Sequence, residues 1–344
     1  MEHYAGLDVS LELTSVCVVD AQGGIVFETK VPSEPEALIR YFGTLKLSIT
    51  RIALEAGPLS QWIHAGLVGA GFETVLLETR HVKAALAAMT VKTDRRDARG
   101  IAQLLRLGWY RPVHAKSVGA QEVRSLLTAR KLMQAKLLDV ECSIRGVLRG
   151  FGLKVGPISR GRFAMRVSEL VDGQPILETV IGAMLTARSA LETEFKRLHR
   201  ALLGIVRDDP VCHQLMSVPG VGAIVAITFK SGIDDPARFK RSRDVRPHFG
   251  LTPKKYQSGE LDVTGSITKV GDRMVRTALY EAASVMLTRT VRFSGLKAWG
   301  MAVAKRRGTR KARVALARKL GVILHRMWVD GSYFRWSNEV TAIA

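Results

Sequence analysis

Four carboxylate side chains in the first hundred residues have the types and positions that suit binding of a divalent metal ion. They are Asp8, Glu55, Asp94 and Asp97. The chain has 344 residues, with 52 Lys and Arg against 31 Asp and Glu, and a formal net charge of +21. Such an excess favours a polyanionic partner. Because acids repel phosphate unless a cation such as Mg²⁺ lies between them, this combination favours an enzyme that processes nucleic acid.

Each acid falls in a predicted element that would hold it. Asp8 lies inside a predicted strand, where aspartate is disfavoured, and Glu55 ends an apolar run just before a Gly-Pro break. Asp94 and Asp97 are three residues apart in a predicted helix that Thr93 could cap, so they share a helix face. Ion pairing, the helix dipole or solvent exposure would each explain a single acid. The four together match a site for two Mg²⁺ ions that clamp the attacking and leaving oxygens of a phosphodiester.

The order of predicted elements indicates the fold of residues 1–116. The apolar pattern predicts strands at 4–9, 15–19, 25–31, 51–54 and 74–77, and helices at 34–45, 60–70 and 93–107. A meander of three strands followed by alternating helices and strands is typical of a ribonuclease H or RuvC-like mixed sheet with flanking helices. Actin-like sugar kinases share this sheet order. The chain lacks their glycine-rich phosphate and adenosine loops, and its basic charge also disfavours them.

Residues 117–207 are predicted to form a helical region. Apolar residues recur every three or four positions over 121–150 and 169–207, on either side of the glycine-rich stretch 150–161, which predicts two long amphipathic helices. These helices would form a helical hairpin or an antiparallel coiled coil. Two interpretations stay open: packing within a larger domain, or a dimerising arm.

Residues 208–344 are predicted to form a mainly α-helical domain. The turn 217–222 before the apolar run 223–228 resembles a helix-hairpin-helix element, in which glycine lets backbone N–H groups approach a DNA phosphate. A plain turn before a buried helix is the alternative. Between residues 269 and 326, 15 Lys and Arg against two acids give a net charge of +13. This segment, with its dense run at 305–313, predicts nucleic-acid contact.

Other features of the composition limit the cell compartment and the redox chemistry. No run of about 18 uncharged apolar residues occurs, and the N-terminus lacks a basic segment followed by an apolar one. We therefore expect a cytoplasmic protein without membrane contact. The three cysteines, Cys17, Cys142 and Cys212, are far apart, which indicates neither a disulfide framework nor a zinc site.

Several motifs resemble the DEDD transposases of bacterial mobile elements, the insertion-sequence 110 family. In the N-terminal part they are Gly6-Leu7-Asp8, Leu54-Glu55-Ala56-Gly57 and Lys92-Thr93-Asp94-Arg95-Arg96-Asp97-Ala98. In the C-terminal half they are the segments 218–222, 249–259, 267–272 and 276–280. The motifs follow one another in the family's order over nearly the whole chain.

This resemblance implies a recombinase that cuts and rejoins DNA. A RuvC-like domain would bind Mg²⁺ through the four acids, and a transposase domain would supply Ser258 as the nucleophile, held as a phosphoserine intermediate. Family members form homodimers and homotetramers in which the acids and the serine come from different protomers. They also use a noncoding bridge RNA that pairs with donor and target DNA. The resemblance implies these partners for this chain as well.

The surroundings of Ser258 bear on its role. A serine before a glycine is usually a turn residue, but Lys254 and Lys255 are predicted to hold phosphates, Tyr256 to stack or orient, and Gly259 to allow close approach of the backbone. No histidine lies beside the serine to act as base, and metal activation would remove that need. The predicted nucleic-acid-binding residues are Lys254, Lys255, Tyr256, Lys269, Arg273, Arg276, Lys305, Arg306, Arg307, Arg310, Lys311 and Arg313.

Two other functions stay open on the sequence. A metal-only RuvC-like nuclease or junction resolvase would use water as its nucleophile, and Ser258 would then be structural. A non-catalytic RNA- or DNA-binding protein would use the basic C-terminal segment and keep the acids in ion pairs.

Overall fold

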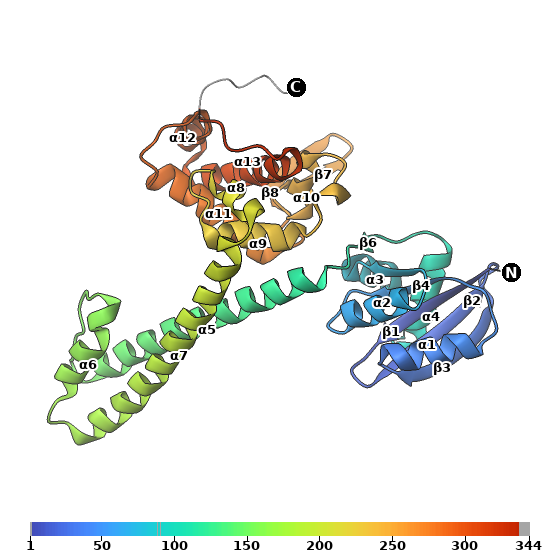
Figure 1. Ribbon diagram of the computed structural model, residues 1–344, viewed down its shortest axis with the longest axis horizontal. Coiled ribbons are helices and arrows are strands. Elements are labelled where there is room, and N and C mark those ends of the chain that lie inside the picture. Colours follow the sequence, from blue (N-terminus) through green and yellow to red (C-terminus); the bar gives the residue numbers. More distant parts are fainter. Residues whose placement is uncertain (1, 88, 90, 337–344) are drawn as a thin grey trace. The chain divides into compact units, whose positions relative to one another are not determined.

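The computed structural model describes residues 2–87, 89 and 91–336. The chain divides into two compact units, Met1–Lys116 and Ser117–Ala344, each with its own hydrophobic core (Figure 1). Residues 117–207 belong to the same unit as the C-terminal region. The predicted division between residues 207 and 208 stays a prediction.

The first unit is built on a six-stranded sheet with the order β3-β2-β1-β4-β5-β6. An antiparallel meander comes first, and two strands parallel to β1 follow. The strands are β1 (His3–Val9), β2 (Leu13–Asp20), β3 (Ile25–Pro32), β4 (Ile49–Glu55), β5 (Thr74–Leu77) and the short antiparallel β6 (Pro112–Val113). This order confirms the predicted ribonuclease H or RuvC-like mixed sheet.

Helices cover both faces of this sheet (Figure 1). On one face, α1 (Pro35–Thr44) and α2 (Ser60–Gly69) pack against Leu7 of β1 and Leu54 of β4. On the other face, α4 (Asp94–Arg106) packs against β1 and β2. The sequence did not predict α3 (Thr79–Leu86) or β6, because α3 buries a single apolar residue and β6 has two residues.

The second unit begins with a long helical hairpin. As predicted, α5 (Val118–Gly150) and α7 (Pro175–Arg207) are long amphipathic helices, and they run antiparallel, with Glu141 paired to Arg188. The predicted helix 169–207 is wrong at its start. A separate helix, α6 (Phe163–Val171), ends before Gly173, whose φ is +76°, and α7 begins at a proline. Glycine in the left-handed region and proline at a first helical position mark such a break.

The rest of the second unit is mainly helical, as predicted. Its core joins α9, α11 and α13 through residues such as Phe229, Leu279 and Leu320. The helices are α8 (Pro210–Met216), α9 (Ala223–Ile233), α10 (Val245–His248), α11 (Arg273–Thr288), α12 (Gly295–Arg307) and α13 (Thr309–Asp330). The unit also contains a hairpin of β7 (Pro253–Ser258) and β8 (Leu261–Ile267), which the sequence did not predict.

The turn between α8 and α9 resembles a helix-hairpin-helix turn in its element order. Gly220 has φ +84°, and a Cβ there would come within 2.4 Å of the Ala282 carbonyl oxygen in α11. Its neighbours Val218 and Val221 are buried. The glycine at this turn is therefore required for packing on α11, which favours the plain turn before a buried helix.

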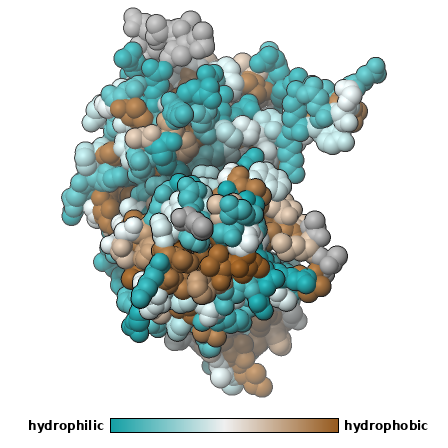
Figure 2. All heavy atoms as spheres, turned by 90° about the vertical axis from the view of Figure 1, so that its right-hand side faces the viewer, coloured by the Kyte–Doolittle hydropathy of each residue, from teal (hydrophilic) through white to brown (hydrophobic). Residues whose placement is uncertain are grey.

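The face drawn in Figure 2 is largely hydrophilic, with hydrophobic residues exposed among the polar ones. Within the described ranges, every helix is too short or too polar to span a membrane.

Candidate active site

Asp8 and Glu55 lie at the carboxyl ends of neighbouring parallel strands, Asp8 next to last in β1 and Glu55 last in β4. β1 and β4 pair in register as far as Leu7 opposite Leu54, so the next residue on each strand is an acid. Because side chains two residues apart share a face, Asp8 points to the same side of the sheet as Gly6. That is the side covered by α4. The strand register therefore brings both acids toward the helix that carries the other two.

Small residues let α4 lie directly on the sheet. A Cβ at Gly6 would come within 2.3 Å of the Ala98 carbonyl oxygen and of the Ala102 amide nitrogen. Cys17, opposite Gly6 on β2, is fully buried against the same two alanines. A side chain at Gly6 would push the helix away from the sheet, so this glycine determines how closely α4 approaches the strands.

The start of α4 carries the other two acids. Thr93 caps the helix as predicted, because its hydroxyl accepts a hydrogen bond from the Arg96 amide at 3.3 Å. Asp94 and Asp97 lie in the first turn, where the helix dipole favours negative charge. The Asp97 side chain is 19% exposed and the Asp94 side chain 58% exposed.

Three of the four acids line one cavity of about 380 Å³. They are Asp8, Glu55 and Asp97, and Lys92 lines the cavity with them. A neighbouring cavity of about 400 Å³ shares Glu55, Lys92 and Asp97. Asp94 lies outside both linings, but its charge acts on Asp8.

The acids repel one another. The pKa of Asp8 is raised to about 6, first by burial and then by the charges of Asp97, Asp94 and Glu55. Burial also raises the pKa of Glu55, and the charge of Asp97 adds to this, whereas a hydrogen bond from Thr79 opposes it. Negative charge therefore exceeds positive charge in the cavity, although Lys92 also lines it.

The donor set of this cavity suits a hard divalent cation. Carboxylate oxygens are the ligands that Mg²⁺ prefers. Burial and then the neighbouring acids raise the pKa of Asp8, and a bound cation would offset the repulsion among these acids. In the part of the chain that the structure describes, no three His, Cys, Asp or Glu side chains are close enough to hold a metal ion as they stand.

Two lysines that the sequence analysis missed partly neutralise the acids. The Lys92 Nζ lies 3.8 Å from an Asp97 carboxylate oxygen, and the Lys30 Nζ lies 3.7 Å from one of Asp94. The position of Lys92 within the Lys-Thr-Asp motif was the available signal. Lys30 lies on β3, and its approach to α4 depends on the fold.

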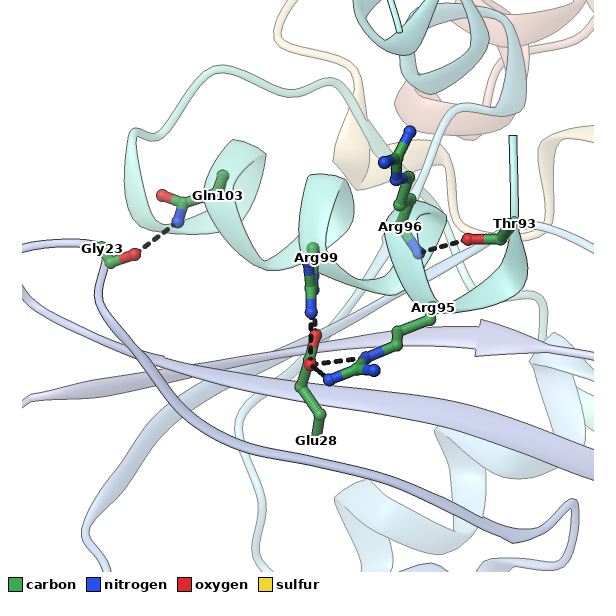
Figure 3. A network of polar contacts seen from close by, with 7 residues as sticks. All are labelled: Gly23, Glu28, Thr93, Arg95, Arg96, Arg99 and Gln103. Atoms are coloured by element: carbon green, nitrogen blue, oxygen red, sulfur yellow. Dashed lines mark hydrogen bonds and ion pairs between the residues drawn. The ribbon is translucent and has the colours of Figure 1, made fainter. Parts of the chain in front are cut away.

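A network of polar contacts holds α4 to the meander (Figure 3). The carboxylate of Glu28 on β3 accepts hydrogen bonds from Arg95, at 2.6 Å, and from Arg99. Farther along the helix, the Gln103 side chain donates to the Gly23 carbonyl oxygen at 2.7 Å. Glu28 was also missed by the sequence analysis, because nothing local distinguishes it from other exposed strand acids.

Ser258 is the last residue of β7 and is exposed. It pairs with Leu261 across the two-residue turn of Gly259 and Glu260. Gly259 has φ +56° and open space around it. Glycine therefore suits the turn conformation, and its predicted role in close approach of the backbone stays a prediction. Among the described residues, none is hydrogen-bonded to the Ser258 hydroxyl.

The two faces of the hairpin differ. Tyr256 shares the face of Ser258, since the two are two residues apart on a strand, and it is 63% exposed. Lys255 faces the other way and forms an ion pair with Asp262 at 3.2 Å. Lys254 is exposed. Lys255, one of the two lysines predicted to hold phosphates, is therefore already paired with an acid.

The base of the hairpin is held by Arg276. Its Nη1 donates to the carbonyl oxygens of Phe249, Val270 and Gly271 at 3.0, 3.1 and 3.1 Å. At the same place Gly250 has φ +64°, and a Cβ there would come within 2.1 Å of the Val270 carbonyl oxygen. Arg276, predicted to bind nucleic acid, therefore also joins the two ends of the Ser258 hairpin.

The other predicted nucleic-acid-binding residues form two groups. Lys269 and Arg273 line a cavity of about 480 Å³ together with Arg276 and Tyr280. The second group lies at the junction of two helices, on either side of Gly308. It comprises Lys305, Arg306 and Arg307 at the end of α12, and Arg310, Lys311 and Arg313 near the start of α13.

The second group is not neutralised by acids. Across residues 2–87, 89 and 91–336, none of these six side chains forms an ion pair. Three of them lie near the start of α13, where the helix dipole disfavours positive charge. A bound anion would both neutralise these side chains and offset their unfavourable interaction with the helix dipole.

Two family models match the chain. The model for DEDD transposases of IS110 elements, described as a transposase, matches residues 5–152. The model described as the transposase IS116/IS110/IS902 family matches residues 212–298.

Curated relatives are similar over most of the chain. The transposase for insertion sequence element IS1111A from Coxiella burnetii is 27% identical, over 93% of this chain and 87% of the relative. The probable family 20 transposase from Pseudomonas aeruginosa is 26% identical, over 93% of this chain and 94% of the relative. Among solved structures, RuvC of T. thermophilus in complex with a Holliday junction substrate matches at TM-score 0.27 and 16% identity, over 33% of this chain and 100% of that chain. Because that score is low, the RuvC-like assignment rests on the strand order alone.

Proposed function

The chain belongs to the IS110 family of DEDD transposases, which are enzymes that cut and rejoin DNA. We propose that it cuts and rejoins DNA with Ser258 as the nucleophile and with Mg²⁺ bound by four acids. These acids are Asp8, Glu55, Asp94 and Asp97. The observation that carries the proposal is the cavity that three of them share at the carboxyl ends of β1 and β4.

The acids and the neighbouring lysine have separate tasks in this proposal. A divalent cation bound there would offset the charge that develops on a phosphodiester and lower the pKa of an attacking hydroxyl. Asp8 and Glu55 would hold it from the sheet, and Asp97 and Asp94 would hold it from α4. Lys92 is 87% exposed at its side chain and is free to move from Asp97 to a DNA phosphate once the acids hold a cation.

Ser258 performs the transfer. Its Oγ attacks the phosphorus, the P–Oγ bond forms as the bond to one bridging oxygen breaks, and the Oγ proton ends on the departing DNA hydroxyl. Attack by the hydroxyl of another DNA end then reverses the step and releases the serine. The exposure of Ser258 at a hairpin tip supports access to DNA, and the absence of a hydrogen-bonded base among the described residues supports activation from outside the hairpin.

The partners of the reaction follow from charge and resemblance. The segment 269–326 and its basic residues without acidic partners support binding of a nucleic-acid backbone. On the resemblance to the family, we assign a noncoding bridge RNA as the guide that pairs with donor and target DNA. We also assign a homodimer or homotetramer in which the acids and the serine belong to different protomers.

The test is a covalent protein–DNA adduct that survives denaturation. With element DNA, bridge RNA and Mg²⁺, the wild type should form it, whereas Ser258→Ala and Asp8→Asn should not. Ser266→Ala, an exposed serine on the other strand of the same hairpin, is the matched control and should keep the adduct. Full strand exchange by Ser258→Ala would refute the nucleophile.

The same assay separates the two alternatives. Cleavage without an adduct in the wild type would identify a metal-only nuclease or junction resolvase. Salt-sensitive binding without any Mg²⁺-dependent cleavage would identify a non-catalytic nucleic-acid-binding protein.

A further inference from the structure

We propose that Glu28 is a positioning residue that holds the N-terminal half of α4 on the sheet and so sets where the helix-borne acids lie relative to the strand-borne ones. The inference rests on the proposed metal-binding role of the four acids. Glu28 belongs to none of the motifs that resemble the family, and its side chain is 8% exposed although it lies on an edge strand.

Strand pairing places Glu28 beneath α4. Glu28 is opposite Cys17 on β2, and Cys17 is opposite Gly6 on β1. Directly opposed residues share a face of the sheet, so these three form a row that faces the helix. Gly6 and Cys17 are small and allow close contact with Ala98 and Ala102. Glu28 ends the row with a side chain long enough to reach the helix.

The helix presents two arginines to this carboxylate (Figure 3). Arg95 and Arg99 are four residues apart and therefore lie on one helix face. The Arg95 Nε donates to Glu28 Oε2 at 2.6 Å, the Arg99 Nη2 donates to the same oxygen at 2.6 Å, and the Arg99 Nε donates to Oε1. The contact of Arg99 is bidentate, and a bidentate guanidinium–carboxylate contact fixes the relative orientation of the two groups as well as their distance. The first two turns of α4 therefore carry the acids Asp94 and Asp97 as well as the two arginines that Glu28 binds.

The low pKa of Glu28 indicates that its contact with the two arginines is stronger than an exposed ion pair. Hydrogen bonds from Arg99 and Arg95 hold the pKa of Glu28 down at about 2, despite the opposing effect of its burial. The carboxylate is therefore ionised at any pH at which the enzyme works. Without it, two arginines would be left near the start of α4, where the helix dipole disfavours positive charge.

The effect of removing Glu28 should be local. The C-terminal half of α4 has a separate anchor, because Gln103 donates to the Gly23 carbonyl oxygen, and its apolar side chains Ile101 and Leu105 are buried in the core. The N-terminal half, which carries Asp94 and Asp97, has the Glu28 contact and the Thr93 cap. Loss of Glu28 therefore frees the end of the helix that bears the acids.

The experiment uses full-length protein and measures Mn²⁺ binding calorimetrically without DNA, as well as the Mg²⁺ concentration at half-maximal cleavage. Glu28→Gln should weaken Mn²⁺ binding by about tenfold and raise the Mg²⁺ requirement similarly, since outer-shell partners commonly contribute that much to metal affinity. Glu28→Asp, which keeps the charge, should recover part of the loss. Glu73→Gln is the control, because it breaks an ion pair with Arg51 near the opposite ends of the strands and should leave both values unchanged.

The outcomes distinguish this inference from the proposed function. Asp97→Asn should weaken Mn²⁺ binding strongly, and an unchanged affinity in that variant would refute the metal site itself. If Asp97→Asn weakens binding but folded Glu28→Gln binds Mn²⁺ like the wild type, Glu28 only stabilises the fold and the positioning role is wrong. Should Glu28→Gln fail to fold, Arg95→Gln removes one of the two arginines that bind Glu28. A loss of Mn²⁺ affinity in that variant would support the role. Unchanged affinity in Arg95→Gln would then overturn it.

Discussion

Replacing Asp8 by asparagine should stabilise the metal-free protein while it abolishes DNA cleavage. Asparagine has nearly the same shape as aspartate but no charge. It therefore removes the cost of burying the Asp8 charge and, in addition, the repulsion between Asp8 and the acids around it. A site built to bind a cation is expected to destabilise the fold when no cation is bound, and this variant measures that cost.

The size of the expected stabilisation follows from the raised pKa of Asp8. A rise from 3.8 to about 6 is roughly two units, and at about 1.4 kcal/mol per unit this corresponds to at most about 3 kcal/mol. Asp8 is partly exposed, and screening by solvent reduces the figure to about 1–2 kcal/mol. We expect the free energy of unfolding of the first unit to increase by this amount in Asp8→Asn at pH 8 in the presence of EDTA.

The gain should depend on pH in one direction. Because the pKa of Asp8 is raised in the folded state, protonated Asp8 carries no penalty, and the penalty develops as the pH rises from 3.8 through about 6. Above that range the penalty is complete. The difference between Asp8→Asn and the wild type should therefore be full at pH 8 and close to zero at pH 3.

Hydrogen exchange followed by mass spectrometry provides the assay, because the buried amides of β1 and β4 exchange through unfolding of the whole unit. After correction for intrinsic exchange rates, their protection should rise about tenfold in Asp8→Asn at pH 8, since 1.4 kcal/mol is a factor of ten. Mg²⁺ should then stabilise the wild type more than the variant. Unchanged or lower protection in metal-free Asp8→Asn, or a gain that persists at pH 3, would refute the reasoning.

Three further predictions test how the structure positions the site. Gly6→Ala should destabilise the first unit by about 3 kcal/mol, because its Cβ would overlap the α4 backbone. Gly43→Ala in α1 is the control: it has open space and should stabilise the unit by about 0.5 kcal/mol. Thermal unfolding measures both changes. Arg276→Met should speed hydrogen exchange in β7 and β8 by about tenfold, because three carbonyl groups lose their donor. Arg310→Gln combined with Lys311→Gln should reduce the slope of log affinity against log salt by about 1.8 in DNA binding, if each neutralises one phosphate.

Each of these predictions has a clear contrary result. Equal stability of Gly6→Ala and the wild type would mean that α4 does not lie directly on β1. Unchanged exchange in the hairpin of Arg276→Met would show that Arg276 does not hold its base. An unchanged salt slope in the double variant would show that the start of α13 does not contact the nucleic-acid backbone.

Several features of this protein were readable from the sequence because they are encoded locally. The three-strand meander follows from apolar alternation interrupted at Gly23-Gly24, and the α4 start follows from Thr93 with acids in the first turn. The helices α5 and α7 follow from their apolar periodicity, although the break at Gly173 was missed. Short elements with few buried residues, such as α3, lack a pattern strong enough to predict.

The role of particular residues in the hairpin needed the structure. The sequence marked Ser258 by motif, but its place at the end of β7 depends on pairing with β8 and on a glycine with φ +56°. Arg276 was predicted as a nucleic-acid contact from charge alone. Its bonds to three carbonyl groups became visible only when the ends of the hairpin were brought together.

The sequence by itself determined the chemistry available to this protein: four acids, a serine within a family motif and an excess of positive charge. Tertiary structure alone decided which of these meet. Asp8 and Glu55 become neighbours through the register of parallel strands, and α4 reaches them because Gly6 leaves room for it. Glu28 meets its arginines across 67 and 71 residues of chain. Such contacts depend on strand pairing and helix packing between distant segments, and no local pattern of residues encodes them.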